Sequence, residues 1–331
     1  MATDTDIDTA APAPIRAERD VSLALRHPEV GRIAVVGLGL IGFSLALALA
    51  RTGVTLLGVE PDSAVRRAVF RWPDTPFSEG DLDALPGARL READLVVLAV
   101  PMKVLAPVAD AVAPCLRPGA TFTDTASLKV LPLRELEASA PLGVGVVGGH
   151  PMAGRERGGA ENASAQLFEG HPWALTAGSR TRPVDLERVT WMARQVGARP
   201  VQLDAQAHDR AIAVTSQLPY LAASALARAT ERLALSDPAV VELIGTGWRD
   251  ATRLADQPDW MDTACADNAP GVAEALRLFH QELGEALGVL SRTDDQVATD
   301  LKRAGSRGRM ARRHLLDEPS VEAREGESGP S

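Results

Sequence analysis

The fold class can be deduced from the segment Arg32-Ile33-Ala34-Val35-Val36-Gly37-Leu38-Gly39-Leu40-Ile41-Gly42. Four apolar residues after Arg32 predict a buried strand, and the Gly-x-Gly-x-x-Gly turn then leads into an apolar helical pattern over Phe43–Arg51. In such a turn the first glycine permits the tight bend, the second lets a pyrophosphate approach, and the third lets helix and strand pack closely. We therefore expect a dinucleotide to contact Gly37, Leu38, Gly39, Leu40, Ile41 and Gly42.

A second predicted strand, Thr55–Val59, ends in the acidic residue Glu60. This carboxylate lies 18 residues beyond Gly42, close to the spacing expected of the acid that binds the ribose hydroxyls of the adenosine. Because a carboxylate there would repel a 2′-phosphate, we expect NAD to be the cofactor, in preference to NADP.

Strands and helices alternate through the rest of the first half. Further strands are predicted at 94–100, 120–123 and 144–147, and helices at 63–72, 105–115 and 131–139. This alternation predicts a parallel, doubly wound sheet of the Rossmann type, whose strands end at one edge where ligands bind. We expect that edge to gather the glycine turn, Glu60, Val100, Pro101, Ser127 and His150.

His150 stands in the segment Gly148-Gly149-His150-Pro151-Met152-Ala153-Gly154, just past the predicted strand at 144–147. An imidazole with an ordinary pKa near 6.5 is well suited to accept a proton at neutral pH. Taken alone, His150 could be a loop histidine that holds a turn, and Ser127 could be a helix N-cap. Together, beside a nicotinamide, they would form a site that oxidises an alcohol.

The composition excludes several other classes of protein. With 331 residues, of which 45% are hydrophobic, the chain is long enough for two domains. A net charge of −9 and an aromatic content of 4% argue against nucleic-acid binding. No uncharged apolar stretch is long enough to span a membrane, and Cys115 and Cys265 lack the spacing of a metal site or a disulfide framework. We expect a cytoplasmic protein without a bound metal.

The second half is dominated by helical patterns rich in alanine and leucine. They fall at 184–196, 205–230, 237–244 and 269–290. Such helices are too apolar to stand alone, so we expect an interlocked bundle that forms a homodimer. The predicted organisation is a disordered segment at 1–30, an α/β dinucleotide-binding domain at 31–182, an all-α dimerisation and substrate domain at 183–300, and a disordered tail at 301–331.

Several segments taken in order resemble a known family. They are Gly37–Gly42, Asp124–Lys129, Gly149–Gly154, Leu167–Gly170 with Trp173–Thr176, His208-Asp209, and Arg249–Ala255. They resemble the prephenate and arogenate dehydrogenases of tyrosine biosynthesis over about residues 32–290. The resemblance implies oxidative decarboxylation of a cyclohexadienol carboxylate. It also implies that His150 is the catalytic histidine, Ser127 its hydroxyl partner and Arg253 the arginine that binds the substrate carboxylate. Arg249 shares a helix face with Arg253 and is a further candidate.

One departure from the family pattern leaves the substrate open. Where many members carry two histidines, this chain has Gln217 and Tyr220, which can hydrogen-bond a substrate but carry no positive charge at neutral pH. Prephenate is the expected substrate, with arogenate and 4-amino-4-deoxyprephenate as alternatives. A β-hydroxy acid dehydrogenase would need a catalytic lysine, and none occurs between Lys129 and Lys302. A non-catalytic nucleotide-sensing dimer would have no need of His150, Ser127 and Arg253 together.

Overall fold

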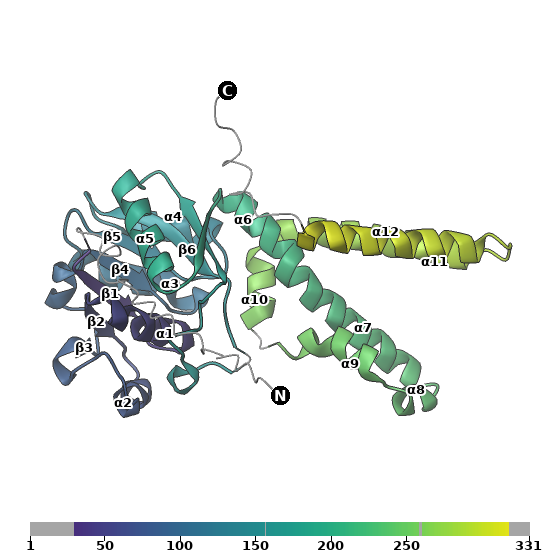
Figure 1. Ribbon diagram of the computed structural model, residues 1–331, viewed down its shortest axis with the longest axis horizontal. Coiled ribbons are helices and arrows are strands. Elements are labelled where there is room, and N and C mark those ends of the chain that lie inside the picture. The colour runs from purple at the N-terminus through teal and green to yellow at the C-terminus, as the bar shows by residue number, and fades with distance from the viewer. Residues whose placement is uncertain (1–29, 156, 258–259, 318–331) are drawn as a thin grey trace, which may run out of the picture. The chain divides into compact units, whose positions relative to one another are not determined.

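The computed structural model describes residues 30–155, 157–257 and 260–317. The chain divides after His208 into two compact units, each of which is described by itself (Figure 1). The first unit is an α/β domain and the second is helical, as the sequence predicts. The division comes later than the expected boundary at 182/183, because another helix and another strand still belong to the first unit.

The first unit is built on an eight-stranded sheet with the order β3-β2-β1-β4-β5-β6-β7-β8. Its strands are β1 (Arg32–Val36), β2 (Thr55–Val59), β3 (Leu82–Asp83), β4 (Leu95–Leu98), β5 (Thr121–Asp124), β6 (Gly145–Pro151), β7 (Pro172–Ala177) and β8 (Arg199–Gln202). The strands from β3 to β6 are parallel, whereas β7 runs antiparallel to β6. The parallel sheet is therefore confirmed through β6, and an antiparallel partner follows it.

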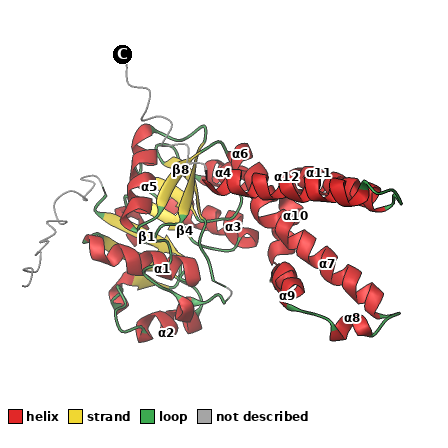
Figure 2. Cartoon of the chain, turned by 45° about the vertical axis from the view of Figure 1, so that its right-hand side comes forward, coloured by secondary structure: helices red, strands yellow, loops and turns green. Residues whose placement is uncertain are grey.

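Helices cover both faces of this sheet (Figure 2). They are α1 (Leu40–Leu49), α2 (Ser63–Arg71), α3 (Met102–Val112), α4 (Val130–Ser139) and α5 (Pro183–Gln195). Alternate residues of β1 supply the two cores: Ile33 and Val35 belong to the core with α1 and α5, whereas Ala34 and Val36 belong to the core with α3 and α4. Burial on both faces explains why these strands are continuously apolar.

The end of β6 differs from the sequence prediction. The strand extends to Pro151, so that His150 lies within it, near its carboxyl end, and not in the loop beyond. Pairing with parallel β5 stops at Val147, and the remaining residues pair with β7, where His150 lies opposite Ala174. The antiparallel partner thus prolongs the strand past the point where the apolar pattern ends.

The second unit consists of helices. Helix α6 (Ala205–Ile212) begins in the first unit and leads into the second. The helices that follow it are α7 (Leu218–Ala234), α8 (Ala239–Glu242), α9 (Thr246–Thr252), α10 (Trp260–Asp267), α11 (Ala269–Leu290) and α12 (Val297–Asp317). A π-helical turn, Ala213–Gln217, interrupts the helix that was predicted to run unbroken over 205–230. Val272 and Ala275 of α11 pack on Ala213 in a small core.

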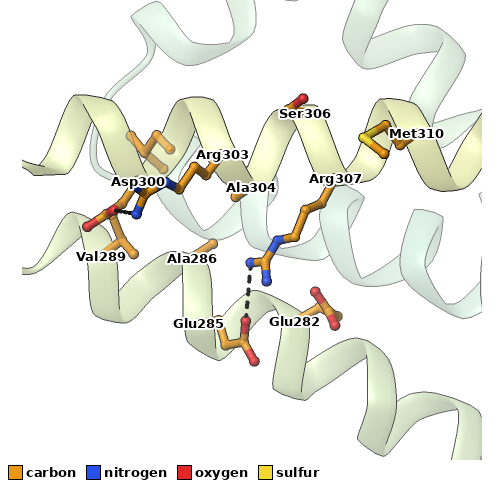
Figure 3. A pocket seen from close by; sticks show the side chains of 11 residues that line it. Glu282, Glu285, Ala286, Val289, Asp300, Arg303, Ala304, Ser306, Arg307 and Met310 are labelled. Atoms are coloured by element: carbon orange, nitrogen blue, oxygen red, sulfur yellow. Dashed lines mark hydrogen bonds and ion pairs between the residues drawn. The ribbon is translucent and has the colours of Figure 1, made fainter.

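The expected disordered tail at 301–331 is wrong for its first part, because α12 reaches Asp317; the remaining residues lie outside the described part of the chain. The segment is rich in arginine and alanine, both strong helix formers. It lies beside α11, where Arg307 forms a 3.7 Å ion pair with Glu285 across a groove between the two helices (Figure 3). A charged sequence can therefore form a helix here against a neighbouring one.

Candidate active site

The glycine turn has the geometry that a dinucleotide needs. Gly37 adopts a φ of +89°, and a Cβ there would lie 2.6 Å from the Ala99 carbonyl oxygen. A Cβ on Gly42 would lie 1.9 Å from the carbonyl oxygen of Gly37, so helix α1 can approach the turn only without a side chain. At Gly39, by contrast, a Cβ would meet nothing within 4 Å. Among the residues that the structure describes, no side chain caps the N-terminus of α1, so its first N–H groups can bind a phosphate.

Glu60 lies at the end of β2 beside this turn, as the spacing predicts. Its buried carboxylate accepts hydrogen bonds from the backbone N–H groups of Leu38, at 2.8 Å, and Asp62, at 2.9 Å. Each carboxylate oxygen has a second lone pair that a ribose hydroxyl can use. Arg66, which no sequence motif marks, donates from its guanidinium to the carbonyl oxygens of Glu60, at 2.6 Å, and Pro61, at 2.7 Å.

Val100 and Pro101 follow β4 at the same edge of the sheet. A Cβ on Gly37 would lie 2.8 Å from a methyl group of Val100, and Pro101 is the N-cap residue of α3. These positions fit a nucleotide lying along the carboxyl ends of β1, β2 and β4.

A buried ion pair fixes the backbone just before His150. The Lys129 ammonium is fully buried, forms an ion pair with the Asp124 carboxylate, and donates to the Gly149 carbonyl oxygen at 2.5 Å. The Asp124 carboxylate in turn accepts the Gly149 N–H at 3.0 Å. Both backbone polar groups of Gly149 are therefore held. Lys129 was not predicted as a functional residue, although an Asp and a Lys five residues apart at the end of a buried strand are a signal for such a pair.

The ring of His150 contacts a second histidine. Its Nδ1 lies 2.9 Å from Nε2 of His208, with the two rings in an edge-to-face arrangement at 72°. Burial, and then the positive charge of Lys129 and the presence of His208, hold the pKa of His150 well below its usual value of 6.5. His150 is thus neutral at physiological pH and can accept a proton.

Ser127 lies after β5 but is not hydrogen-bonded to His150. Its Oγ donates weakly to the Met102 sulfur at 3.7 Å. Helix α4 begins at Val130 with Lys129 as its N-cap residue, so Ser127 does not cap it. The hydroxyl is only partly buried and can turn toward a ligand.

The remaining predicted residues belong to the helical unit. Gln217 is buried, donating to the Ala264 carbonyl oxygen at 2.8 Å and accepting from Asn268 at 2.7 Å. The Tyr220 hydroxyl donates to the Asp262 carboxylate at 2.6 Å, and this bond is the largest cause of a raised pKa of Tyr220. Both side chains thus already serve the packing of the unit, which sequence alone did not reveal.

Arg249 and Arg253 were expected to share a helix face. Arg249 lies on α9, and Arg253 begins the single 3₁₀ turn that continues it. Both are exposed, and neither guanidinium has a hydrogen bond or ion pair among the residues that the structure describes. They are available to an anionic ligand. No group of side chains that could hold a metal ion is found among the described residues, and no described helix is long and apolar enough to cross a membrane.

Two family models match the chain one after the other. The nucleotide-binding domain of prephenate dehydrogenase matches residues 45–202, and the dimerization domain of prephenate dehydrogenase matches residues 204–303.

Curated relatives and solved structures carry related names. The chain is 30% identical over 283 residues to cyclohexadienyl dehydrogenase of Zymomonas mobilis, covering 84% of this chain and 95% of that protein. It is 33% identical over 249 residues to the probable prephenate dehydrogenase NovF of Streptomyces niveus, covering 74% of this chain and 65% of that protein. The crystal structure of Synechocystis arogenate dehydrogenase superimposes with a TM-score of 0.74 at 27% identity, covering 86% of this chain and 99% of that one. Prephenate dehydrogenase from A. aeolicus in complex with hydroxyphenyl propionate and NAD+ has a TM-score of 0.73 at 25% identity, with the same coverage.

Proposed function

The chain belongs to the prephenate dehydrogenase family of NAD-dependent oxidoreductases, and from this premise we propose that it converts prephenate to 4-hydroxyphenylpyruvate by oxidative decarboxylation in tyrosine biosynthesis. The observation that carries the proposal is His150, a histidine held neutral in a partly buried site on the strand edge that also presents the glycine turn. An alcohol can be oxidised there only if such a base takes its proton.

The cofactor of the proposed reaction is NAD, which accepts the hydride when bound. The open approach at Gly39, the uncapped start of α1 and the Glu60 carboxylate support this choice. The A. aeolicus relative was solved with NAD+. Glu60 would hold the ribose hydroxyls and disfavour a 2′-phosphate at the same place.

The residues of the chain account for the proton in the reaction. As hydride leaves the ring carbon, His150 takes the hydroxyl proton and the C–O bond becomes a carbonyl. The bond to the ring carboxylate then breaks, CO2 leaves, and its electron pair makes the ring aromatic while the oxygen regains a proton. Ser127 would orient the hydroxyl, because within the described part of the chain its Oγ donates only to the weak sulfur acceptor of Met102 and can exchange that bond for one to the substrate.

The helical unit would bind the rest of the substrate. Arg253 offers a planar fork matched to a carboxylate, with Arg249 as a second cation for the other carboxylate. Gln217 and Tyr220 already hydrogen-bond Ala264, Asn268 and Asp262. They could therefore bind a substrate only through the donor and acceptor positions that those bonds do not use. A contact from Gln217 or Tyr220 would therefore be neutral and weaker than one from a charged histidine.

The chain would act as a cytoplasmic homodimer. Leucines on α11 remain exposed, among them Leu283 at 54%, Leu287 at 66% and Leu290 at 59%. Apolar exposure on this scale is typical of a surface that another chain covers. The match of residues 204–303 to a dimerization domain supports the same assignment.

A direct assay tests the proposed reaction. Purified protein is offered NAD with prephenate, arogenate or 4-amino-4-deoxyprephenate, and the absorbance of reduced nicotinamide is followed. We expect the highest kcat/KM with prephenate. A higher value with either amino compound would transfer the assignment to that substrate, and no reduction with any of the three would refute the proposed function.

A further inference from the structure

His208 is a buried histidine with a firmly fixed position but no part in the reaction described so far. It stands at 2% exposure in the first turn of α6. Asp204 caps that turn: its carboxylate accepts the N–H groups of Gln206, at 2.8 Å, and Ala207, at 3.0 Å, and its carbonyl oxygen accepts the N–H of His208 at 2.9 Å. The backbone of His208 is thereby held in the first turn of α6.

The contact between the two rings allows two arrangements with opposite chemical consequences. One hydrogen lies between His150 Nδ1 and His208 Nε2, which are 2.9 Å apart. If His208 donates it, the neutral His150 carries its own hydrogen on Nε2 and cannot take a proton there. If His150 donates it, the lone pair of His150 lies on Nε2, the nitrogen left for a substrate.

We propose that His208 is a positioning residue: its Nε2 accepts the Nδ1–H of His150 and so fixes the tautomer whose Nε2 takes the proton of the substrate. The base role of His150 in this statement rests on the proposed function, whereas the direction of the hydrogen bond does not. His208 touches no reacting atom and acts only through His150.

The charges around the pair favour this arrangement. Lys129, held by Asp124, is the permanent cation that acts on His150, and His208 is the other titratable neighbour that does so. A second positive charge beside the buried ammonium is costly, so the ring of His150 stays neutral at rest. Once His150 takes a proton, its Nδ1–H becomes a charged donor to Nε2 of His208, and such bonds are shorter and stronger than neutral ones. Nε2 of His208 therefore stabilises His150 most strongly after the substrate proton has moved to His150.

Three variants test the role by kinetics. In His208→Phe the ring keeps its approximate shape but loses the acceptor, leaving the Nδ1–H of His150 buried and unsatisfied. We expect kcat to fall about 10-fold to 100-fold, the range that a buried unsatisfied donor implies, with little change in either KM. In His208→Gln the amide oxygen can replace Nε2, and most of kcat should return. His171→Phe, which alters an exposed histidine, is the matched control and should keep the wild-type rate.

A measurement of the tautomer needs no turnover. The chain has six histidines, so ring-nitrogen NMR shifts of protein carrying ¹⁵N-histidine can be assigned to His150 by comparison with His150→Asn. We expect Nδ1 of His150 to be protonated at neutral pH in the wild type. A protonated Nε2 would overturn the inference whatever the activity, as would an unchanged kcat in a folded His208→Phe. If no dienol were oxidised but the shifts were as expected, only the proposed function would fail.

Discussion

The pKa of His150 sets the pH range in which the site can work. An unperturbed imidazole would place the acidic limb of the rate profile near pH 6 to 7. Burial and the Lys129 charge lower the pKa of His150, so the imidazole stays unprotonated well below pH 6.5. We expect kcat/KM to remain level from neutral pH to below 6.5 and to fall only at more acidic pH.

Replacing His150 tests the base itself. His150→Asn keeps a similar size but cannot accept the proton, so kcat should fall about 10²-fold to 10⁴-fold, the usual contribution of a general base. The acidic limb should vanish with it, while NAD binding and the melting temperature stay close to wild type. A mutant that kept its rate and its acidic limb would make His150 a structural residue.

Arg253 should act on substrate affinity alone. Lysine keeps the charge but cannot reproduce the two parallel hydrogen bonds of a guanidinium to a carboxylate. We expect Arg253→Lys to raise the KM for the dienol roughly tenfold or more, about 1.4 kcal/mol, with an unchanged KM for NAD. Arg249→Lys measured in parallel shows which of the two arginines binds the carboxylate. An unaltered KM in Arg253→Lys would transfer the role to Arg249 or another group.

Glu60 and Arg66 together should decide the choice of cofactor. The wild type is expected to prefer NAD, because the carboxylate repels a 2′-phosphate. Glu60→Gln removes the charge, keeps one oxygen acceptor for the turn and leaves the Arg66 guanidinium nearby. The ratio of kcat/KM for NADP to that for NAD should rise at least tenfold, since like charges in contact cost several kcal/mol and about 1.4 kcal/mol is already a factor of ten. Equal use of both cofactors by the wild type would contradict the role of Glu60.

At the scale of single elements, the sequence predicted the strands that are buried on both faces, because such strands are continuously apolar. Strands β1 and β2 were predicted within their observed bounds, because every residue after the first is buried. Strand β8 was missed: its four residues are exposed or half-buried and include Pro200, so that no apolar run marks it. Strand β7 was not predicted either, and its antiparallel direction could not be, because strand direction depends on a partner that is distant in sequence.

The ion pair of Lys129 with Asp124, which links the end of β5 to Gly149 of β6, can be tested by substitution. Lys129→Met leaves the Asp124 carboxylate buried without its cation, which should cost about 3–5 kcal/mol of unfolding free energy. Burial remains as the larger cause of the lowered pKa of His150, but the second cause is lost. The pKa of His150 should therefore rise, and the acidic limb of kcat/KM should move toward higher pH. Denaturant unfolding and the pH profile measure the two effects, and an acidic limb that did not move would exclude Lys129 as an influence on His150.

At the scale of the molecule, the two-part organisation was predictable but its division was not. The change from strand to helix patterns suggested a boundary at 182/183, whereas α5 and β8 still pack on the first sheet. Likewise α12 is too polar to signal a packed helix, and it becomes one only beside α11. In each case the missing information was a tertiary contact.

Assembly can be tested on the exposed face of α11. Leu287→Glu places a charge among the exposed leucines and should convert a dimer to a monomer at micromolar concentration, as measured by light scattering. Leu142→Glu is the control, because that leucine is 91% exposed on the first unit and should leave the dimer intact. A monomeric wild type would refute the assignment.

The π-helical turn at Ala213–Gln217 holds one residue more than an α-helical turn would. An α-helix turns by about 100° per residue, and the wider π turn advances less per residue, so the additional residue is accommodated without rotating the helix that follows. Removing one residue here would let ordinary α-helical hydrogen bonds close, while α7 kept its orientation and Tyr220 its bond to Asp262. The chain can therefore differ in length by one residue at this turn without changing which residues α7 presents to its neighbours.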